Sequence, residues 1–106
     1  MALLDTPPAD EVRVRLRLYI ARSTPNSVRA ELNLSAVLDG FRDRLDLEIV
    51  DVFAQPKRAI TDGVVATPTL IGLAADRRIV LMGDLADLTQ VRGALEGLLE
   101  ELPYEA

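Results

Sequence analysis

Two hydroxyl-bearing residues with two positions between them, Thr24 and Ser27, are spaced as a reactive pair could be. A serine or threonine hydroxyl becomes a nucleophile only when a neighbouring base removes its proton. The chain has no histidine, and Lys57 is its only lysine, so a base is hard to supply. A hydroxyl residue just before Pro25 is instead typical of a helix start, where it caps free backbone amides. We therefore predict a structural role for these hydroxyls, with Ser23 or Thr24 as the helix cap.

Three arginines form a second candidate site, because they alternate with apolar residues between positions 12 and 20. Strict alternation predicts a strand that places Arg13, Arg15, Arg17 and Tyr19 on one face and valine, leucine and isoleucine on the other. Such a basic stripe suits an anion or an acidic partner. It also suits a solvated sheet face on which arginine stems cover apolar surface, and we favour this second interpretation.

The overall composition narrows the chemistry further. With 12 basic and 17 acidic residues, the net charge of −5 argues against binding of nucleic acid or of an anionic membrane surface. The absence of cysteine and histidine removes disulfides, thiolate nucleophiles and the commonest metal ligands. We interpret the acidic residues near the end (Glu96, Glu100, Glu101 and Glu105) as a solvated face rather than a metal site, and we expect no cofactor.

Hydrophobic periodicity and turn residues predict seven elements. In chain order they are a strand at 12–20, a helix at 25–40, a strand at 45–53, a short helix at 56–62, a strand at 64–73, a strand at 78–82 and a helix from 88 to about 102. The order βαβαββα favours a parallel crossover between the first two strands and a hairpin between the last two. The class is therefore α/β with a four-stranded mixed sheet.

Two helices should pack an apolar side against this sheet. For the first, the apolar positions are Val28, Leu32, Leu34, Val37, Leu38 and Phe41. For the last, they are Leu88, Val91, Leu95, Leu98 and Leu102. The segment from Asp87 to Gln90 resembles a capping box, so we predict that Asp87 begins the last helix.

The chain length of 106 residues predicts one domain. We place it at residues 12–102, after a disordered lead-in at 1–11 and before a short tail at 103–106. Residues 1–8 lack the basic start and long apolar run of a signal peptide, and no apolar run could span a bilayer. We therefore expect a cytoplasmic protein.

Two motifs together resemble the skeleton of a thioredoxin-like fold. They are Ala66-Thr67-Pro68-Thr69-Leu70, which opens a strand, and Leu18-Tyr19-Ile20-Ala21, which runs into the helix start near Pro25. The resemblance implies a cis peptide bond before Pro68 that faces the first helix. Redox members of that fold carry Cys-x-x-Cys where this chain has Thr24-Pro25-Asn26-Ser27.

The same motifs, taken with several others, resemble the KaiB family of bacterial circadian-clock proteins over about residues 14 to 102. The most specific pieces are Leu18-Tyr19-Ile20-Ala21, Thr24-Pro25-Asn26-Ser27-Val28-Arg29-Ala30, Val50-Asp51-Val52, Ala66-Thr67-Pro68-Thr69-Leu70 and Gly83-Asp84-Leu85.

The resemblance implies a non-enzymatic module that binds the hexameric ATPase KaiC. It also implies contact with KaiA or a clock histidine kinase, and a homodimer or homotetramer in an alternative fold into which the monomer switches. The residues that we select as partner-binding candidates are Arg29, Asp46, Glu48, Lys57 and Arg58.

Three positions depart from the family pattern. Clock members have a Pro-rich segment where this chain has Ala74-Ala75-Asp76-Arg77, and a Gly-x-Asp where it has Ala94-Leu95-Glu96. They also have a lysine that reaches KaiC at the position of Glu48. We select Thr67, Pro68, Ala94 and Glu96 as fold-determining residues and expect the thioredoxin-like form to be the resting state, since alanine and glutamate are good helix formers.

Three functional hypotheses follow. The first is clock regulation through binding of a KaiC-type ATPase. The second is a divergent member of the family that acts in stress response or signalling without timekeeping, because Glu48 reverses a partner-facing charge. The third is a thioredoxin-like enzyme, for which the absence of cysteine and histidine leaves little room.

Overall fold

In the part of the chain that the structure describes, seven helices and strands follow one another in the order predicted from the sequence. The computed structural model describes residues 14–41, 44–74 and 77–100. Its elements are β2 (Val14–Ile20), α2 (Pro25–Leu38), β3 (Leu45–Asp51), α3 (Pro56–Thr61), β4 (Thr69–Ala74), β5 (Arg77–Met82) and α4 (Leu88–Leu99). The βαβαββα arrangement is therefore confirmed.

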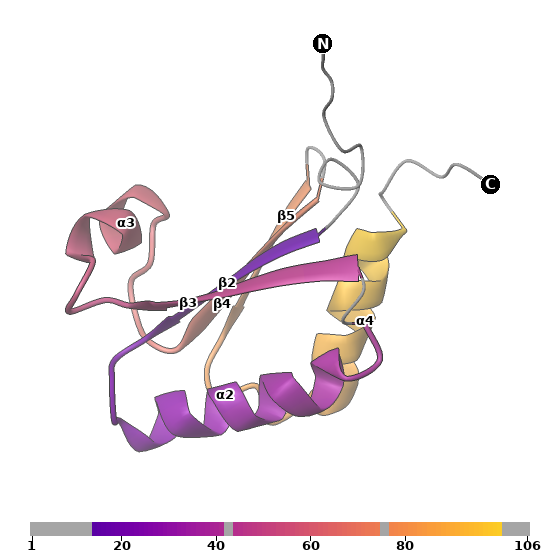
Figure 1. The fold of residues 1–106 in the computed structure, drawn as a ribbon, viewed down its shortest axis with the longest axis horizontal. Coiled ribbons are helices and arrows are strands. Elements are labelled where there is room, and N and C mark those ends of the chain that lie inside the picture. Colours follow the sequence, from indigo (N-terminus) through magenta and orange to yellow (C-terminus); the bar gives the residue numbers. More distant parts are fainter. Residues whose placement is uncertain (1–13, 42–43, 75–76, 101–106) are drawn as a thin grey trace, which may run out of the picture.

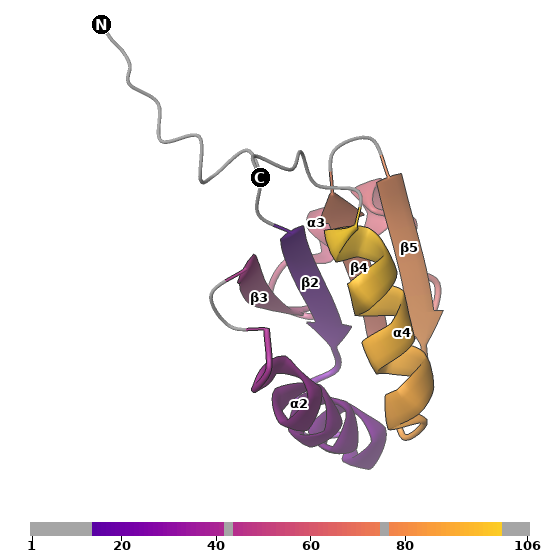
Figure 2. The same ribbon diagram turned by 90° about the vertical axis from the view of Figure 1, so that its right-hand side faces the viewer.

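The strands form one mixed sheet in the order β3-β2-β4-β5. β2 and β3 are parallel and are joined through α2, whereas β4 pairs antiparallel with both β2 and β5. Helices α2 and α4 lie on one face of the sheet, and the short helix α3 lies on the opposite face (Figures 1 and 2). The sheet consequently has two faces with different covers.

The main core fills the space between the sheet and the two longer helices. The alternation in β2 places Val14, Leu16 and Leu18 in this core, where they are almost fully buried together with Leu34 of α2 and Leu95 of α4. These side chains are aliphatic, so their burial is stabilised by removal of apolar surface from water.

Gly72 of β4 allows α4 to approach the sheet closely. A Cβ atom at this position would lie 2.6 Å from Cδ1 of Leu98 and 3.2 Å from Cδ2 of Leu16. Such distances are well inside normal van der Waals contact, so only a residue without a side chain fits beside Leu98 without a shift.

A smaller core lies on the other face, beneath α3. It consists of Tyr19, Val50, Ala59 and Ile71. Tyr19, which we placed among the arginines on the polar face, is fully buried there. The face that we interpreted as solvated is thus partly covered.

Several predicted positions differ in the structure. Val28 and Leu32, predicted to face the core, are 46% and 67% exposed, because the buried side of α2 runs instead through Ala30, Leu34 and Val37. The strand predicted at 64–73 begins only at Thr69, after the bend at 66–68. The strand predicted to reach residue 53 ends at Asp51, whose side chain accepts a hydrogen bond from the Phe53 amide and turns the chain.

The two helix starts have different outcomes. Asp87 caps α4 as predicted, since its carboxylate accepts the Gln90 amide at 3.1 Å. Thr24 occupies the cap position of α2, but its side chain caps no helix amide, so this part of the prediction is wrong. Its hydroxyl donates instead to the Ala21 carbonyl at 2.8 Å.

The C-terminal half of the described chain has the secondary structure predicted for the thioredoxin-like form. Residues 69–74 form a strand and residues 88–99 form a helix. The Thr67–Pro68 peptide bond is cis, as predicted. The lead-in at 1–11, Arg13, the middle of the 74–77 turn, Glu101, Leu102, Glu105 and the tail at 103–106 lie outside the described residues.

Candidate partner-binding site

The α3 side of the sheet brings charged side chains from separate strands into register. Arg17 of β2 lies opposite Glu48 of β3 and Ile71 of β4, and Arg15 lies opposite Asp46. Because paired residues of neighbouring strands point to the same face, this register continues to Val80 on β5. The alternation seen in the sequence therefore places charged side chains of β2 and β3 next to one another, beside apolar side chains of β4 and β5 on the same face.

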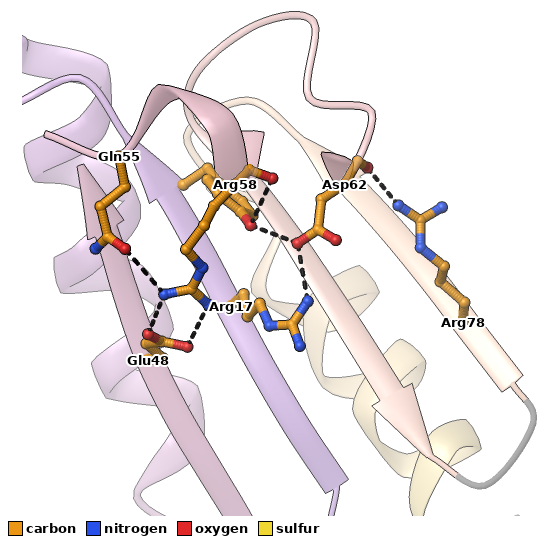
Figure 3. A network of polar contacts seen from close by, with 7 residues as sticks. Arg17, Glu48, Gln55, Arg58, Asp62 and Arg78 are labelled. Carbon is orange, nitrogen blue, oxygen red and sulfur yellow. Dashed lines mark hydrogen bonds and ion pairs between the residues drawn. The ribbon is translucent and has the colours of Figure 1, made fainter. Parts of the chain in front are cut away.

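Asp62, directly after α3, is the centre of a polar network on this face. Its carboxylate accepts a hydrogen bond from Arg17 Nη1 at 2.9 Å, and another from the hydroxyl of the buried Tyr19. The backbone carbonyl of Asp62 accepts from Arg78 Nη2 of β5 at 2.6 Å (Figure 3). The Tyr19 hydroxyl also lies 3.3 Å from the carbonyl oxygen of Arg58. One loop residue is thus tied to both β2 and β5.

A second contact joins α3 to the edge strand β3. The guanidinium of Arg58 grips the Glu48 carboxylate through both terminal nitrogens, with Nη2 at 2.7 Å from Oε1 (Figure 3). Arg58 Nη1 also lies 3.4 Å from Oε1 of Gln55. Two parallel bonds between a planar guanidinium and a carboxylate form the geometrically most specific kind of ion pair.

These contacts shift the pKa values of Tyr19, Asp62 and Glu48. Burial raises the pKa of Tyr19, and its hydrogen bond to Asp62 raises it further. Burial alone would raise the pKa of Asp62, but the hydrogen bonds from Tyr19 and Arg17 outweigh it, so that pKa lies below its ordinary value. The hydrogen bond from Arg58 lowers the pKa of Glu48. Asp62 and Glu48 are therefore held as carboxylates.

A pocket of about 230 Å³ opens beside this network. It is lined by Arg17, Tyr19, Lys57, Arg58, Thr61 and Asp62. Arg17 and Arg58 are each paired with a carboxylate, whereas exposed Lys57 makes no ion pair or hydrogen bond within the described part of the chain. The pocket can receive an acidic group. Among the described residues, no group of acidic side chains could hold a metal ion.

The structure brings together Glu48, Lys57 and Arg58 out of the predicted partner-binding residues. Asp46 lies two residues before Glu48 on β3, so its side chain is on the same face of the strand. Arg29 is separate: it lies on α2, pairs with Asp84 at 3.4 Å and contacts the Asn26 side chain. Together with a bond from Asn33 to the Asp84 carbonyl at 2.8 Å, it ties the loop before α4 to α2.

Thr24 and Ser27 have a structural role, but not as the side-chain cap that was predicted. Ser27 is buried, and its Oγ accepts the Ala21 amide at 3.1 Å. Thr24 donates to the carbonyl of the same residue. The two hydroxyls therefore fix the turn between β2 and α2 and leave no free nucleophile.

The residues predicted to determine the fold lie at two places. Pro68 is buried, and its carbonyl accepts the Gly83 amide at 3.0 Å, while Thr67 is half-buried beside it. Ala94 and Glu96 lie on α4, half-buried and exposed respectively. No contact of Ala94 or Glu96 tests their assigned role, which stays a prediction.

Sequence reasoning missed Tyr19 and Asp62 as members of the site. A signal was present for the first: a tyrosine among arginines on a strand face has an apolar ring to bury and a hydroxyl that needs a partner. For Asp62 no local signal existed, since only the packing of α3 on the sheet brings it to Arg17 and Tyr19.

Comparison with known proteins identifies the family. The KaiB domain matches residues 17–96. The circadian clock oscillator protein KaiB of Rippkaea orientalis is 40% identical over 88 residues, which cover 82% of this chain and 85% of that protein. KaiB of Nostoc sp. is 40% identical over 91 residues, covering 85% and 84% of the two chains.

Solved structures support the fold. The thioredoxin Deadhead of Drosophila melanogaster superposes with a TM-score of 0.72 at 16% identity, covering 85% of this chain and 84% of the other. Fasciola hepatica thioredoxin gives a TM-score of 0.72 at 16% identity over 84% of each chain. Among the described residues, no helix has the length and apolarity that a membrane crossing requires. The fold is thioredoxin-like, and by its sequence the chain belongs to the KaiB family of circadian clock oscillator proteins.

Proposed function

We propose that this protein is a non-enzymatic, cytoplasmic interaction module that binds a KaiC-type ATPase in its thioredoxin-like form. The domain that carries this function is the segment predicted at residues 12–102. The observation that supports the proposal best is the pocket on the α3 side of the sheet, where exposed Lys57, unpaired among the described residues, lies beside the ion-paired Arg17 and Arg58. A surface of this kind suits acidic side chains of a protein partner.

Glu48, which stands where clock members have a lysine, is paired with Arg58. This pairing makes the reversed charge compatible with an acidic partner. A glutamate in place of a lysine would repel an acidic partner if it stood alone. Here both of its oxygens are occupied by the Arg58 guanidinium, at 2.5 and 2.7 Å. The negative charge is thereby neutralised locally, and Lys57 of the pocket lining is left without an ion pair among the described residues.

Binding to the KaiC-type ATPase of the same organism, measured while ATP is hydrolysed, tests the proposal. We expect a stable complex with the wild-type protein. Lys57→Glu should weaken the complex by about tenfold or more, since it reverses a pocket charge that has no ion pair within the described part of the chain. Arg92→Glu is the matched control, because Arg92 is an exposed arginine of α4 without a polar partner among the described residues. No detectable complex with the wild-type protein would refute the clock function.

Arg29 is the residue for which we propose contact with a KaiA-like protein or a histidine kinase. Its side chain is 55% exposed and its pairing with Asp84 is long, at 3.4 Å, so it can exchange this contact for an external one. We also propose self-association as a dimer or tetramer. Native mass spectrometry across protein concentrations checks the oligomer, and Arg29→Ala checks the second partner.

A divergent role in stress response or signalling is the second candidate. The presence of Glu48, where clock members have a lysine, favours it. Deletion of the gene distinguishes the two candidates: intact rhythms with lower stress survival would support the signalling role, and loss of rhythm would support the clock role.

A further inference from the structure

Helix α3 is held to the sheet by few apolar contacts. Of its residues Pro56–Thr61, only Ala59 is buried, and Ile60 is 76% exposed. A helix of this length has little stability of its own and depends on what it packs against. The residues that fasten it must therefore be sought among its polar contacts.

The polar contacts of α3 reach three strands. Arg58 grips Glu48 on β3, and Asp62 binds Arg17 and Tyr19 on β2 and accepts from Arg78 on β5 (Figure 3). Each polar attachment to β3 and β5, at the two edges of the sheet, involves a charged side chain, while Ala59 adds an apolar contact with the cluster that contains Val50 of β3. Since the side chains of Arg17, Arg58 and Glu48 are 28%, 35% and 50% exposed, salt can screen their charges.

The cluster beneath α3 is separate from the main core. Tyr19, Val50 and Ile71 face α3, whereas the residues packed by α2 and α4 lie on the opposite side of the sheet. Removing α3 from the sheet would expose the smaller cluster and leave the larger one intact. Local opening without global unfolding is expected for a unit that shares so little of the core.

We propose that residues 53–65 form a strap that opens from the sheet as one unit and is closed by the charged contacts of Asp62 and Arg58. Opening would separate Arg17 and Tyr19 from Lys57 and Arg58, and so dismantle the pocket, while β2, β4 and α4 stay folded. The strap is a property of the isolated protein and needs no partner.

Amide hydrogen exchange of the isolated protein tests the strap. The probes are the amides of Asp62, Gly63 and Val64, which bond to the carbonyls of Arg58, Ile60 and Ala59 at 2.9–3.0 Å. We expect these amides to exchange faster than the amides of α4. Their exchange should also accelerate as NaCl is raised from about 0.05 to 1 M, because salt screens the ion pairs that hold the strap. The α4 amides should show no such acceleration.

Two variants separate the charged contacts from the packing. Asp62→Asn should accelerate exchange of the three probes by about tenfold, because it removes the charge that Arg17 and Tyr19 bind. Exchanging the partners in Glu48→Arg with Arg58→Glu should restore the protection that Glu48→Arg alone removes. Exchange of the strap at the same rate as α4 in all salts, in the wild-type protein alone, would overturn the proposal even if a variant failed to fold.

Discussion

The two faces of the sheet are stabilised in different ways. On the side of α2 and α4, the contacts are made by aliphatic residues such as Leu34 and Leu95, which are completely buried. On the side of α3, a small cluster around Tyr19 is combined with ion pairs that are partly open to solvent. Burial of apolar surface involves no charge that salt could screen or pH could titrate, whereas charged contacts are sensitive to both. We therefore expect the α3 side to respond to ionic strength and pH more than the side of α2 and α4.

The largest effect should come from the apolar face. Leu95→Ala removes a fully buried side chain between α4 and the sheet, and we expect a loss of about 2–5 kcal/mol in the free energy of unfolding, from lost burial and the cavity left behind. Urea denaturation measures it. Leu32→Ala is the control on α2: at 67% exposure it should change stability by less than about 0.5 kcal/mol. Equal losses for both leucines would contradict the assignment of this face as the core.

Asp62→Ala should have the next largest effect, about 1–3 kcal/mol, since it deprives the buried Tyr19 hydroxyl and Arg17 of their shared acceptor. The contribution also depends on pH. The pKa of Asp62 is lowered by folding, so its stabilisation is present above the pKa of the unfolded chain, near 4, and is lost as pH falls through the lower folded value.

Tyr19 changes stability at the other end of the pH range. Because folding raises its pKa, its contribution is complete below the unfolded value, about 10, and declines as pH rises through the folded value. Chemical denaturation from acid to alkaline pH, with Tyr19→Phe as the comparison, measures both limbs. An alkaline loss of equal size in Tyr19→Phe would show that another group causes it.

A smaller gain is expected from α4. Gly93 lies inside this helix, and a Cβ atom there would meet nothing within 4 Å. Gly93→Ala should therefore stabilise the protein by about 0.5–1 kcal/mol. Gly63→Ala is the opposite case, since Gly63 has φ of +74° and should lose stability on substitution. Thermal melting of both variants checks the signs, and a gain at Gly63 would be inconsistent with its left-handed conformation.

The smallest effect should come from the edge of the α3 face. Glu48→Gln removes the charge that Arg58 binds at a site where Glu48 is 50% exposed, and we expect a loss of about 0.2–1 kcal/mol at low salt. High salt should abolish the difference between variant and wild type. A salt-independent loss would mean that packing, not charge, joins α3 to β3.

Much of the fold was predictable because its signals are local. Three local signals led to correct predictions. They are the alternation in residues 14–20 for a strand, the three- and four-residue spacing in α4 for a helix, and Asp87 for its cap. The wrong predictions concern side chains whose exposure depends on how neighbouring elements pack. Helix α2 turns Val28 toward solvent although its spacing predicted a core position. The structure also leaves Leu47 and Ile49 of the edge strand β3 exposed, which the pattern of residues 45–53 does not indicate. Periodicity defines a helix face but not which part of it a sheet will cover.

In the candidate site, too, local features were predictable and long-range contacts were not. The charged residues of β2, β3 and α3 could be selected from their types and from the family resemblance. Their pairing could not, because Arg58 and Glu48 are ten positions apart and Asp62 lies more than forty positions from Arg17 and Tyr19. Such contacts require the sheet register and the path of α3 across it.

The amino-acid sequence by itself determined the order of the elements, the absence of thiol and imidazole chemistry, and membership in one family. Only the tertiary structure decided that Tyr19 is buried, that the charge of Glu48 is neutralised by Arg58, and that Asp62 joins α3 to the sheet. The physical reason is range. Propensity, periodicity and capping act within a few residues along the chain, whereas ion pairs and burial depend on distances in space that only the packed sheet establishes.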